Sequence, residues 1–242
     1  MRWGIFSDIH SNLEALEAVI KAYRTEGIDV YLCLGDIVGY GANPVECIQI
    51  TRHITPTIIA GNHDWAVTGM FALDYFNEWA KIAAIWTQKN IDSESYNLLA
   101  SLRLVYEEKD FVLVHGTLNK PEEFNYMVDD FQALQTFALL KKSICFLGHT
   151  HLAGTFIQNE QGRIDYQAEA ELKLREGYRY IVNVGSVGQP RDGDNRSSYC
   201  IYDSQKKSVL IKRVGYDIKS AQEKILVAGL PQFLAERLSV GR

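Results

Sequence analysis

Five short apolar stretches in this 242-residue chain are each followed directly by side chains that can bind a metal ion. Five of the six histidines lie at these positions, and only His53 does not. In α/β proteins the carboxyl ends of strands form the crevice in which ligands bind, so we expect all five groups to meet at one edge of a sheet. The groups are Asp8-Ile9-His10, Gly35-Asp36, Gly61-Asn62-His63-Asp64, His115-Gly116 and Gly148-His149-Thr150-His151.

The number and type of these groups predict two metal ions. Alternation along an extended chain places Asp8 and His10 on one side of the backbone. The same holds for His149 and His151. Two aspartates, one asparagine and four histidines are too many ligands for one ion with an open position, but they suit two ions about 3.5 Å apart. The seven residues are Asp8, His10, Asp36, Asn62, His115, His149 and His151.

The ligand chemistry narrows the choice of metal. Nitrogen and oxygen ligands without thiolate favour Mn, Fe, Zn or Co over Mg or Ca, and Mn is the ion we expect to work in vitro. The alternative for the same groups is a polar network that binds no metal.

Composition excludes several classes of protein. Hydrophobic residues make up 47% and charged residues 23%, as in ordinary globular proteins. The net charge of −5 disfavours nucleic acid as a partner. We expect no membrane span, because no apolar run approaches the roughly 18 residues required, and we find no signal-peptide pattern. The four cysteines lie in apolar runs without a CxxC pair, so we expect core thiols and a cytoplasmic protein. The sequence leaves open whether the protein forms a homo-oligomer.

Strand and helix patterns alternate up to residue 151 and then give way to successive strands. The predicted strands of the first part are 30–34, 57–60, 103–108, 111–115 and 144–147, after an initial strand that ends at Phe6. The predicted helices are one that Ser11 caps, then 43–53, 70–91, 93–101 and 131–142. Strand patterns at 153–158, 163–168, 179–184, 197–203 and 207–213 predict a second, more antiparallel sheet packed on the first. Helices at 218–227 and after Pro231 follow, and we predict a single domain of residues 1–242.

For two segments outside the strand ends, the sequence predicts where they lie in the fold. The stripe of aromatic residues within 70–91 suits either core packing or a wall over the site, and the pattern favours core packing. The polar and aromatic segment 117–130 has no clear period and is predicted to be a loop near the site.

The motifs together resemble the calcineurin-like metallophosphoesterase superfamily. Its Asp-x-His, Gly-Asp, Gly-Asn-His-Asp/Glu, lone His and Gly-His-x-His motifs occur here in order between Asp8 and His151. The segment 183–191 is similar to one in small bacterial and archaeal members of the phosphodiesterase type. The resemblance implies an α/β fold, a four-layer sandwich of two mixed β-sheets flanked by helices.

The resemblance also implies a role for each residue. One metal ion would bind to Asp8, His10 and His151, and the other to Asn62, His115 and His149. Asp36 would bridge the ions, and His63 would act as general acid or transition-state stabiliser near the leaving group. The implied reaction is hydrolysis of phosphodiester bonds in small molecules or nucleotides by a metal-bridging hydroxide.

Departures from the superfamily's Ser/Thr protein phosphatases argue against that activity. Gly39 and Tyr40 stand where those enzymes have Asp and Arg, and Ala60 stands in place of a second Arg. Asp64 either orients His63 or caps a helix, and Arg191 either grips phosphate or is a turn residue.

For two further residues the sequence is compatible with either substrate binding or a structural role. Tyr40 and Asn12 are predicted at the rim of the site, where a ring can cover a substituent and an amide can donate to phosphate. Their alternatives are packing against 44–53 and capping of the first helix.

Three other functions compete with a phosphodiesterase. A phosphomonoesterase or a nucleoside-polyphosphate hydrolase would use the same centre on a different small phosphoester. A non-catalytic metal-binding scaffold would not need His63, which binds no metal in this scheme. A metallo-β-lactamase-type hydrolase is excluded, because Ala153 and Gly154 stand where it needs Asp and His.

Overall fold

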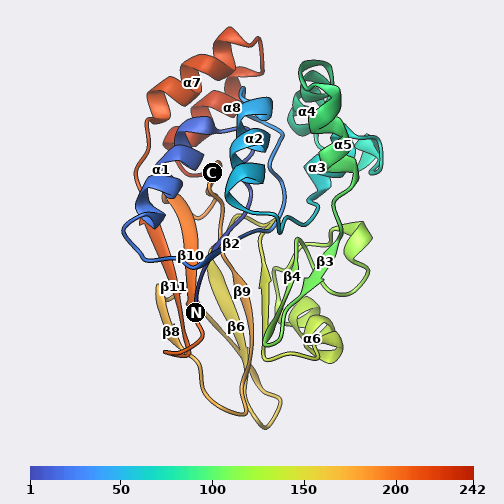
Figure 1. The fold of residues 1–242 in the computed structure, drawn as a ribbon. Helices are drawn as coiled ribbons and strands as arrows, with labels where there is room; N and C mark the ends of the chain where they lie inside the picture. Colours follow the sequence, from blue (N-terminus) through green and yellow to red (C-terminus); the bar gives the residue numbers. More distant parts are fainter.

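Two mixed β-sheets packed face to face form the centre of the computed structural model, which describes residues 1–242 (Figure 1). The first sheet has the order β2-β1-β10-β11-β8 and the second β3-β4-β5-β9-β6-β7. Pairs β1–β2, β4–β5 and β5–β9 are parallel, and the others are antiparallel. The strands are β1 (Arg2–Phe6), β2 (Val30–Cys33), β3 (Val105–Glu107), β4 (Phe111–Val114), β5 (Ile144–Leu147), β6 (Gly154–Gln158), β7 (Ile164–Gln167), β8 (Glu171–Lys173), β9 (Arg179–Asn183), β10 (Ser197–Asp203) and β11 (Ser208–Val214).

Helices cover the outer faces of both sheets and extend beyond one end of the sandwich (Figure 1). They are α1 (Leu13–Tyr23), α2 (Pro44–Ile54), α3 (Asn62–Val67), α4 (Glu78–Asn90), α5 (Ser93–Ala100), α6 (Asp130–Leu139), α7 (Ile218–Val227) and α8 (Gln232–Glu236). Short 3₁₀ turns lie at Leu73–Tyr75, Pro121–Glu123 and Arg237–Ser239. No helix has the length and apolar composition needed to cross a membrane.

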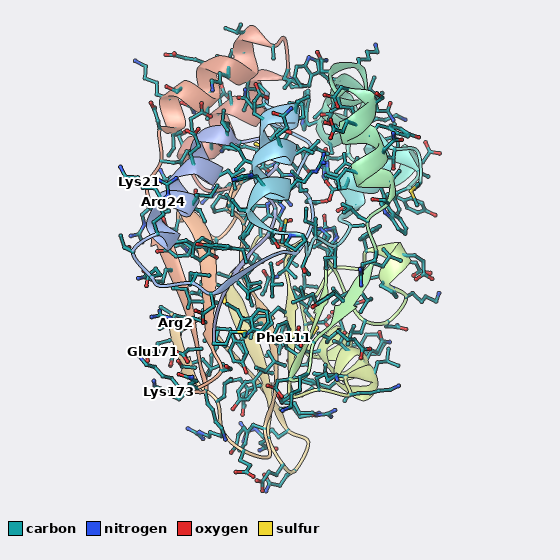
Figure 2. The ribbon with its side chains drawn as sticks, in the orientation of Figure 1. Arg2, Lys21, Arg24, Phe111, Glu171 and Lys173 are labelled. Carbon is teal, nitrogen blue, oxygen red and sulfur yellow. The ribbon has the colours of Figure 1, made fainter.

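Three buried clusters bind the four layers together. Phe111 lies between the sheets, where its ring contacts Phe146 of the second sheet and Tyr202 of the first (Figure 2). A second cluster joins α1 and α2 to the first sheet, and a third joins α6 to the second sheet. Charged side chains such as Lys21 and Glu171 lie on the outside (Figure 2). The predicted four-layer α/β sandwich is confirmed.

The distribution of strands between the sheets differs from the prediction. The strands after residue 151 do not form a sheet of their own: β6, β7 and β9 join the sheet of β4 and β5, whereas β8, β10 and β11 join β1 and β2. The predicted strand 57–60 makes only isolated bridges, from Ile58 to Cys33 and from Ile59 to Arg103. The short elements α3 and β8 were not predicted.

Local sequence features explain where the first two helices begin. The first helix is capped by Asn12, whose side chain accepts from Ala15 N, so the predicted capping by Ser11 is wrong. Pro44 opens α2 as predicted. All four cysteines are buried and free, which confirms their prediction as core thiols.

Candidate metal centre

The predicted groups come together where the carboxyl ends of strands from both sheets meet. Asp8 and Asp36 follow β1 and β2 of the first sheet, whereas His115 follows β4, and His149 and His151 follow β5, of the second. Possible ligand atoms form three overlapping groups, each within 4.8 Å: Asp8, His10 and His151; His10, Asp36 and His63; and Asp36, His115 and His149. The expected convergence is confirmed, but two sheets contribute to it rather than one.

The backbone at these positions is left-handed and not extended. Positive φ angles occur at Asp8 (56°), His10 (51°), Asp36 (52°), His149 (66°) and His151 (63°). Such angles are uncommon for residues with a side chain and persist only where the surrounding structure holds them. The argument from strand alternation is therefore wrong. His149 and His151, two residues apart, join different groups.

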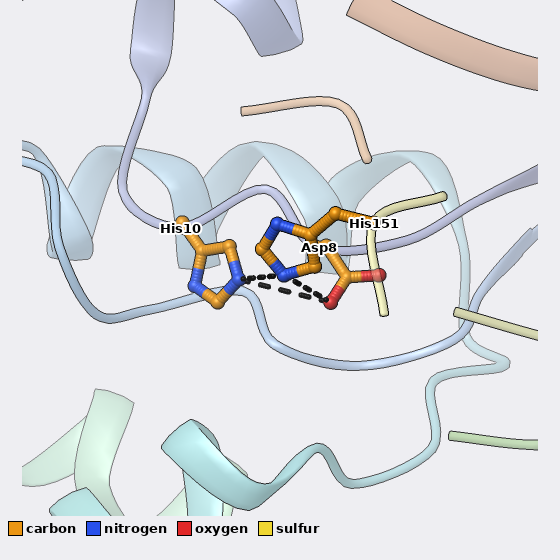
Figure 3. A group of neighbouring side chains, drawn as sticks. All are labelled: Asp8, His10 and His151. Carbon is orange, nitrogen blue, oxygen red and sulfur yellow. Dashed lines mark hydrogen bonds and ion pairs between the residues drawn. The ribbon is translucent and has the colours of Figure 1, made fainter. Parts of the chain in front are cut away.

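Asp8, His10 and His151 form the first group, with their polar atoms facing one another (Figure 3). His151 Nε2 lies 3.1 Å from Asp8 Oδ1 and 3.0 Å from His10 Nε2. His10 Nδ1 lies 3.0 Å from the carbonyl oxygen of Val38, and His151 Nδ1 lies 2.6 Å from that of Gln189.

These contacts determine which nitrogen of each histidine can bind a metal ion. A carbonyl oxygen only accepts, so both Nδ1 atoms carry the hydrogen, and the Nε2 atoms, which face Asp8, are the ones placed to bind a metal ion. Burial, followed by the charge of Arg191, lowers the pKa of His151 to about 3, so its Nε2 presents a lone pair. Asp8 Oδ1 beside them is buried and has no hydrogen-bond partner. The donor set therefore fits a divalent metal ion.

Asp36, His115 and His149 form the second group, with Asn62 nearby in the same pocket as His149. His115 Nδ1 donates to the carbonyl oxygen of Leu34 at 2.7 Å, so its Nε2 faces Asp36. Burial alone would lower the pKa of His115, but the charges of Asp36 and Asp8 raise it to about 9, so a metal ion at Nε2 would replace a proton. That Nε2 and Asn62 Oδ1 are buried without a hydrogen-bond partner. Burial lowers the pKa of His149 to about 3, so its ring is neutral and can act as a ligand. Orphaned buried atoms are rare in native proteins, and this set fits a second ion.

Asp36 lies between the two groups. Its Oδ2 is 3.2 Å from His115 Nε2 and 3.7 Å from His10 Nε2, while its Oδ1 accepts from the backbone N–H of His63 at 2.8 Å. Burial alone would raise the pKa of Asp36, but the neighbouring imidazoles, with His115 first among them, hold it below the ordinary range. An ionised carboxylate in this position is able to contact both ions.

His63 lies beside both groups and is enclosed by rings. Its ring centroid is 4.5 Å from that of Tyr40, 4.6 Å from that of Phe76 and 4.9 Å from that of His10. Burial lowers the pKa of His63, and its Nδ1 has no hydrogen-bond partner. Gly39 allows this packing, because a Cβ there would lie 2.4 Å from His63 Nδ1. The ring is thus held by packing and not by a carboxylate.

Asp64 supports the loop that carries Asp36. Its oxygens accept from the backbone N–H groups of Gly61 (3.0 Å), Asp36 (2.8 Å), Ile37 (2.9 Å) and Val38 (3.3 Å). The first bond caps the start of α3, because Asp64 is its third residue and accepts from the backbone N–H of the N-cap residue Gly61. The predicted alternative of Asp64 as the N-cap residue is therefore wrong in position, although Asp64 does cap this helix, and three further bonds tie α3 to the loop after β2.

A cavity of about 250 Å³ adjoins His63 and is lined by both polar and aromatic side chains. The aromatic lining residues are Tyr40, Phe71, Tyr75, Phe76, Phe124 and Tyr126. The prediction of core packing for 70–91 is therefore wrong for Phe71 and Tyr75, which line the cavity, and for Trp79 and Ile82, which are exposed, whereas Ala83 is buried in the core. The predicted place of loop 117–130 near the site is confirmed, because Tyr126 stacks on His149 at 4.1 Å.

The Asn12 amide is engaged within the protein. Its Nδ2 donates to the carbonyl oxygen of Gly188 at 2.8 Å, and its Oδ1 accepts from Ala15 N at 3.2 Å. The capping alternative thus describes its present contacts, and a role in substrate binding stays a prediction.

Tyr40 and Arg191 lie together near the metal centre. The Tyr40 side chain is almost fully buried, with its ring centroid 4.7 Å from that of His10. The Arg191 guanidinium carbon lies 5.7 Å from the Tyr40 ring centroid. Arg237 also contacts this ring, at 6.0 Å, and was missed because no motif marks it in the sequence.

Comparison with known proteins decides the family. The model described as the calcineurin-like phosphoesterase superfamily domain matches residues 1–207. The chain belongs to this superfamily. Its members are metal-dependent hydrolases, in agreement with the donor groups described above.

Relatives of the superfamily match nearly the whole chain. An uncharacterized protein of Methanocaldococcus jannaschii is 43% identical, with 99% of this chain and 98% of that protein covered. A metallophosphoesterase from Sphaerobacter thermophilus, solved by crystallography, is 38% identical with a TM-score of 0.90, covering 100% and 99% of the two chains. The phosphodiesterase YfcE of Escherichia coli is 26% identical over 87% of this chain and 91% of its own.

Proposed function

We propose that the protein is a dinuclear metal-dependent phosphodiesterase that acts on small-molecule or nucleotide phosphodiesters, with manganese as an effective ion in vitro. The observation that carries the proposal is the set of buried histidine nitrogens and carboxylate oxygens that face one another in overlapping groups at Asp8 and Asp36. The likeness to a protein described as a phosphodiesterase supports diesters as the substrate class.

The seven predicted ligands divide between two ions. Asp8, His10 and His151 would hold one ion, Asn62, His115 and His149 would hold the other, and Asp36 would contact both. When bound, two divalent ions supply positive charge for the phosphate oxygens and an activated water as nucleophile.

His63 would act on the leaving-group oxygen, as transition-state stabiliser or as general acid. Its neutral ring is kept from bulk water by Tyr40 and Phe76, and its backbone N–H is fixed by Asp36. The neutral imidazole can donate a hydrogen bond to the departing oxygen without reorganising, and it would act as a general acid only after taking up a proton, a form that the charge of Asp36 favours. The aromatic cavity beside it would receive an organic substituent of the substrate.

A substrate comparison tests the proposal. The full-length chain would be assayed with added Mn²⁺ on bis(4-nitrophenyl) phosphate and on 4-nitrophenyl phosphate, with a chelated sample as control. We expect metal-dependent hydrolysis with a higher kcat/KM for the diester. A higher value for the monoester would assign a phosphomonoesterase. The absence of metal-dependent turnover on either ester would support a non-catalytic metal-binding role instead.

A further inference from the structure

Two arginines from distant parts of the chain share Tyr40 as a neighbour. The guanidinium carbon of Arg191 lies 5.7 Å from the Tyr40 ring centroid, and that of Arg237 lies 6.0 Å from it. The same ring is 4.7 Å from His10 and 4.5 Å from His63, measured between centroids. Tyr40 therefore links both cations to the proposed metal centre, and Arg191 is also joined to His151, whose carbonyl oxygen accepts from its backbone N–H at 3.3 Å.

Neither guanidinium group is saturated by hydrogen bonds within the protein. Arg191 Nη2 donates to Gln189 Oε1 at 2.9 Å and lies 3.4 Å from the Tyr40 hydroxyl, while its buried Nε has no partner. Arg237 donates from Nε to the carbonyl oxygen of Arg242, and its Nη1 and Nη2 have no protein acceptor. Several N–H donors of each side chain thus remain available.

No side-chain carboxylate forms an ion pair with either guanidinium group, and the main-chain oxygen of the last residue, Arg242, accepts only from Arg237 Nε. Burial, followed by the charge of Arg191, lowers the pKa of Arg237 to about 10, and the groups that oppose this shift are the hydroxyls of Tyr40 and Tyr126. At neutral pH both guanidinium groups remain charged and repel each other. A phosphate group relieves this repulsion and suits the planar, bidentate donors of arginine.

Contacts within the protein occupy only part of the Arg237 guanidinium group. Its flat face lies against the Phe233 ring, with 5.3 Å between the guanidinium carbon and the ring centroid. Its Nε edge donates a hydrogen bond to the main-chain oxygen of Arg242. The Nη edge remains free for a ligand. Arg237 also lies beyond residue 207, where the match to the superfamily domain ends, so the C-terminal segment adds this cation to the site.

We propose that Arg191 and Arg237 together bind a second phosphate group of the substrate while the scissile phosphodiester occupies the metal centre. This inference rests on the proposed phosphodiesterase function and specifies its substrate class: nucleotide-like diesters that carry an additional phosphate. Tyr40 lies between the two phosphate positions and is in contact with both arginines and with His10.

Two matched substrates test the proposal on the Mn²⁺-loaded, full-length chain. Thymidine 5′-(4-nitrophenyl) phosphate and its 3′-phosphorylated counterpart release the same coloured product, 4-nitrophenolate, and differ only in the second phosphate. We expect Arg237→Gln to raise KM for the 3′-phosphorylated ester about tenfold, the scale of one lost charged hydrogen-bond pair, and to change KM for the other ester less than twofold. The control Arg163→Gln removes an equal charge from an exposed turn and should alter neither KM.

A direct binding measurement separates this inference from the proposed activity. Calorimetry would follow thymidine 3′,5′-bisphosphate binding to the full-length chain in the presence of chelator, where neither metal nor turnover contributes. We expect about tenfold weaker binding to Arg237→Gln than to the wild type or Arg163→Gln. Binding that depends on Arg237 would uphold the arginine pair even if neither ester were hydrolysed, an outcome that would reject the proposed function alone.

Other results would overturn the inference. Equal increases in KM for both esters would place Arg237 on the scissile phosphate or in the fold, and unchanged bisphosphate affinity would remove it from binding altogether. Circular dichroism would check that each variant is folded. If Arg237→Gln is not, Arg237→Lys keeps the charge but loses the bidentate fork, and an unchanged KM for the 3′-phosphorylated ester in that variant would also count against the pair.

Discussion

Asp36 is the side chain on which both halves of the proposed metal centre depend. Its Oδ2 lies near His115 of one group and His10 of the other, so loss of its charge weakens both sites. We expect Asp36→Asn to lose bound metal and turnover together, while the amide oxygen can still accept from His63 N–H. Metal analysis by mass spectrometry and kcat on a diester would measure the two effects. Full activity with unchanged metal content would contradict the dinuclear assignment.

His63 has a different expected profile, because it is placed beside the ions and not among their proposed ligands. We expect His63→Ala to keep its metal content while kcat falls about 10²- to 10⁴-fold, the usual scale for a lost general acid. The rings of Tyr40 and Phe76 still enclose the vacated position. Metal analysis run beside the kinetics supplies the control, since a parallel loss of metal would make His63 a ligand.

The sequence predicted the side chains of the candidate metal centre, but not the contacts that orient them. Asp, Asn and His after apolar runs are visible by residue type, and chain topology alone brings strand ends together. The contacts that orient them are tertiary: the carbonyl oxygen of Gln189 holds His151, and Tyr126 stacks on its neighbour His149. Arg237 gives no local signal at all, because only the folded chain places it beside Tyr40.

At the scale of elements, the loop after β2 is held by the start of α3. The Asp64 carboxylate accepts four backbone N–H groups there, and three of them belong to the loop that carries Asp36. An asparagine would turn an NH₂ group toward some of these donors and leave them unpaired. We expect Asp64→Asn to lower the free energy of unfolding by about 1–3 kcal/mol, the cost of buried unsatisfied polar groups.

Two measurements check this role of Asp64. Chemical denaturation gives the stability, and titration with Mn²⁺ gives the metal affinity, which we expect to weaken because the Asp36 backbone is less well held. The matched control is Asp165→Asn, an exposed carboxylate in β7. Wild-type stability and affinity in Asp64→Asn would show that the four hydrogen bonds do not position the loop.

Physical reasons explain why the sequence did not predict some elements and strand pairings. Periodicity shows that a segment is a strand but not which strand it pairs with, and β1 pairs with β10 almost 200 residues later. The apolar run 57–60 resembles a strand, yet it bonds its neighbours only at two bridges. Three-residue β8 has two exposed residues and no apolar pattern to detect.

For the molecule as a whole, the proposed ions would join its two sheets. Asp8 and Asp36 follow strands of the first sheet, while His115, His149 and His151 follow strands of the second. In each group buried carboxylate oxygens and histidine nitrogens from the two sheets lie within reach of one ion. Metal binding should therefore stabilise the packing of the sheets as well as enable chemistry.

Chelation tests this coupling between metal and fold. A ligand that binds only the folded chain at about 100 times its Kd adds about 2.7 kcal/mol to the free energy of unfolding. For a chain of this size each kcal/mol shifts Tm by about 2–4 °C, so we expect EDTA to lower Tm by about 5–10 °C relative to Mn²⁺-loaded protein. Differential scanning calorimetry would measure the shift. Asp36→Asn should show a much smaller difference between the two conditions, because the carboxylate that contacts both proposed ions is gone. An equal Tm for wild-type protein with and without EDTA would mean that the ions, if bound, do not hold the two sheets together.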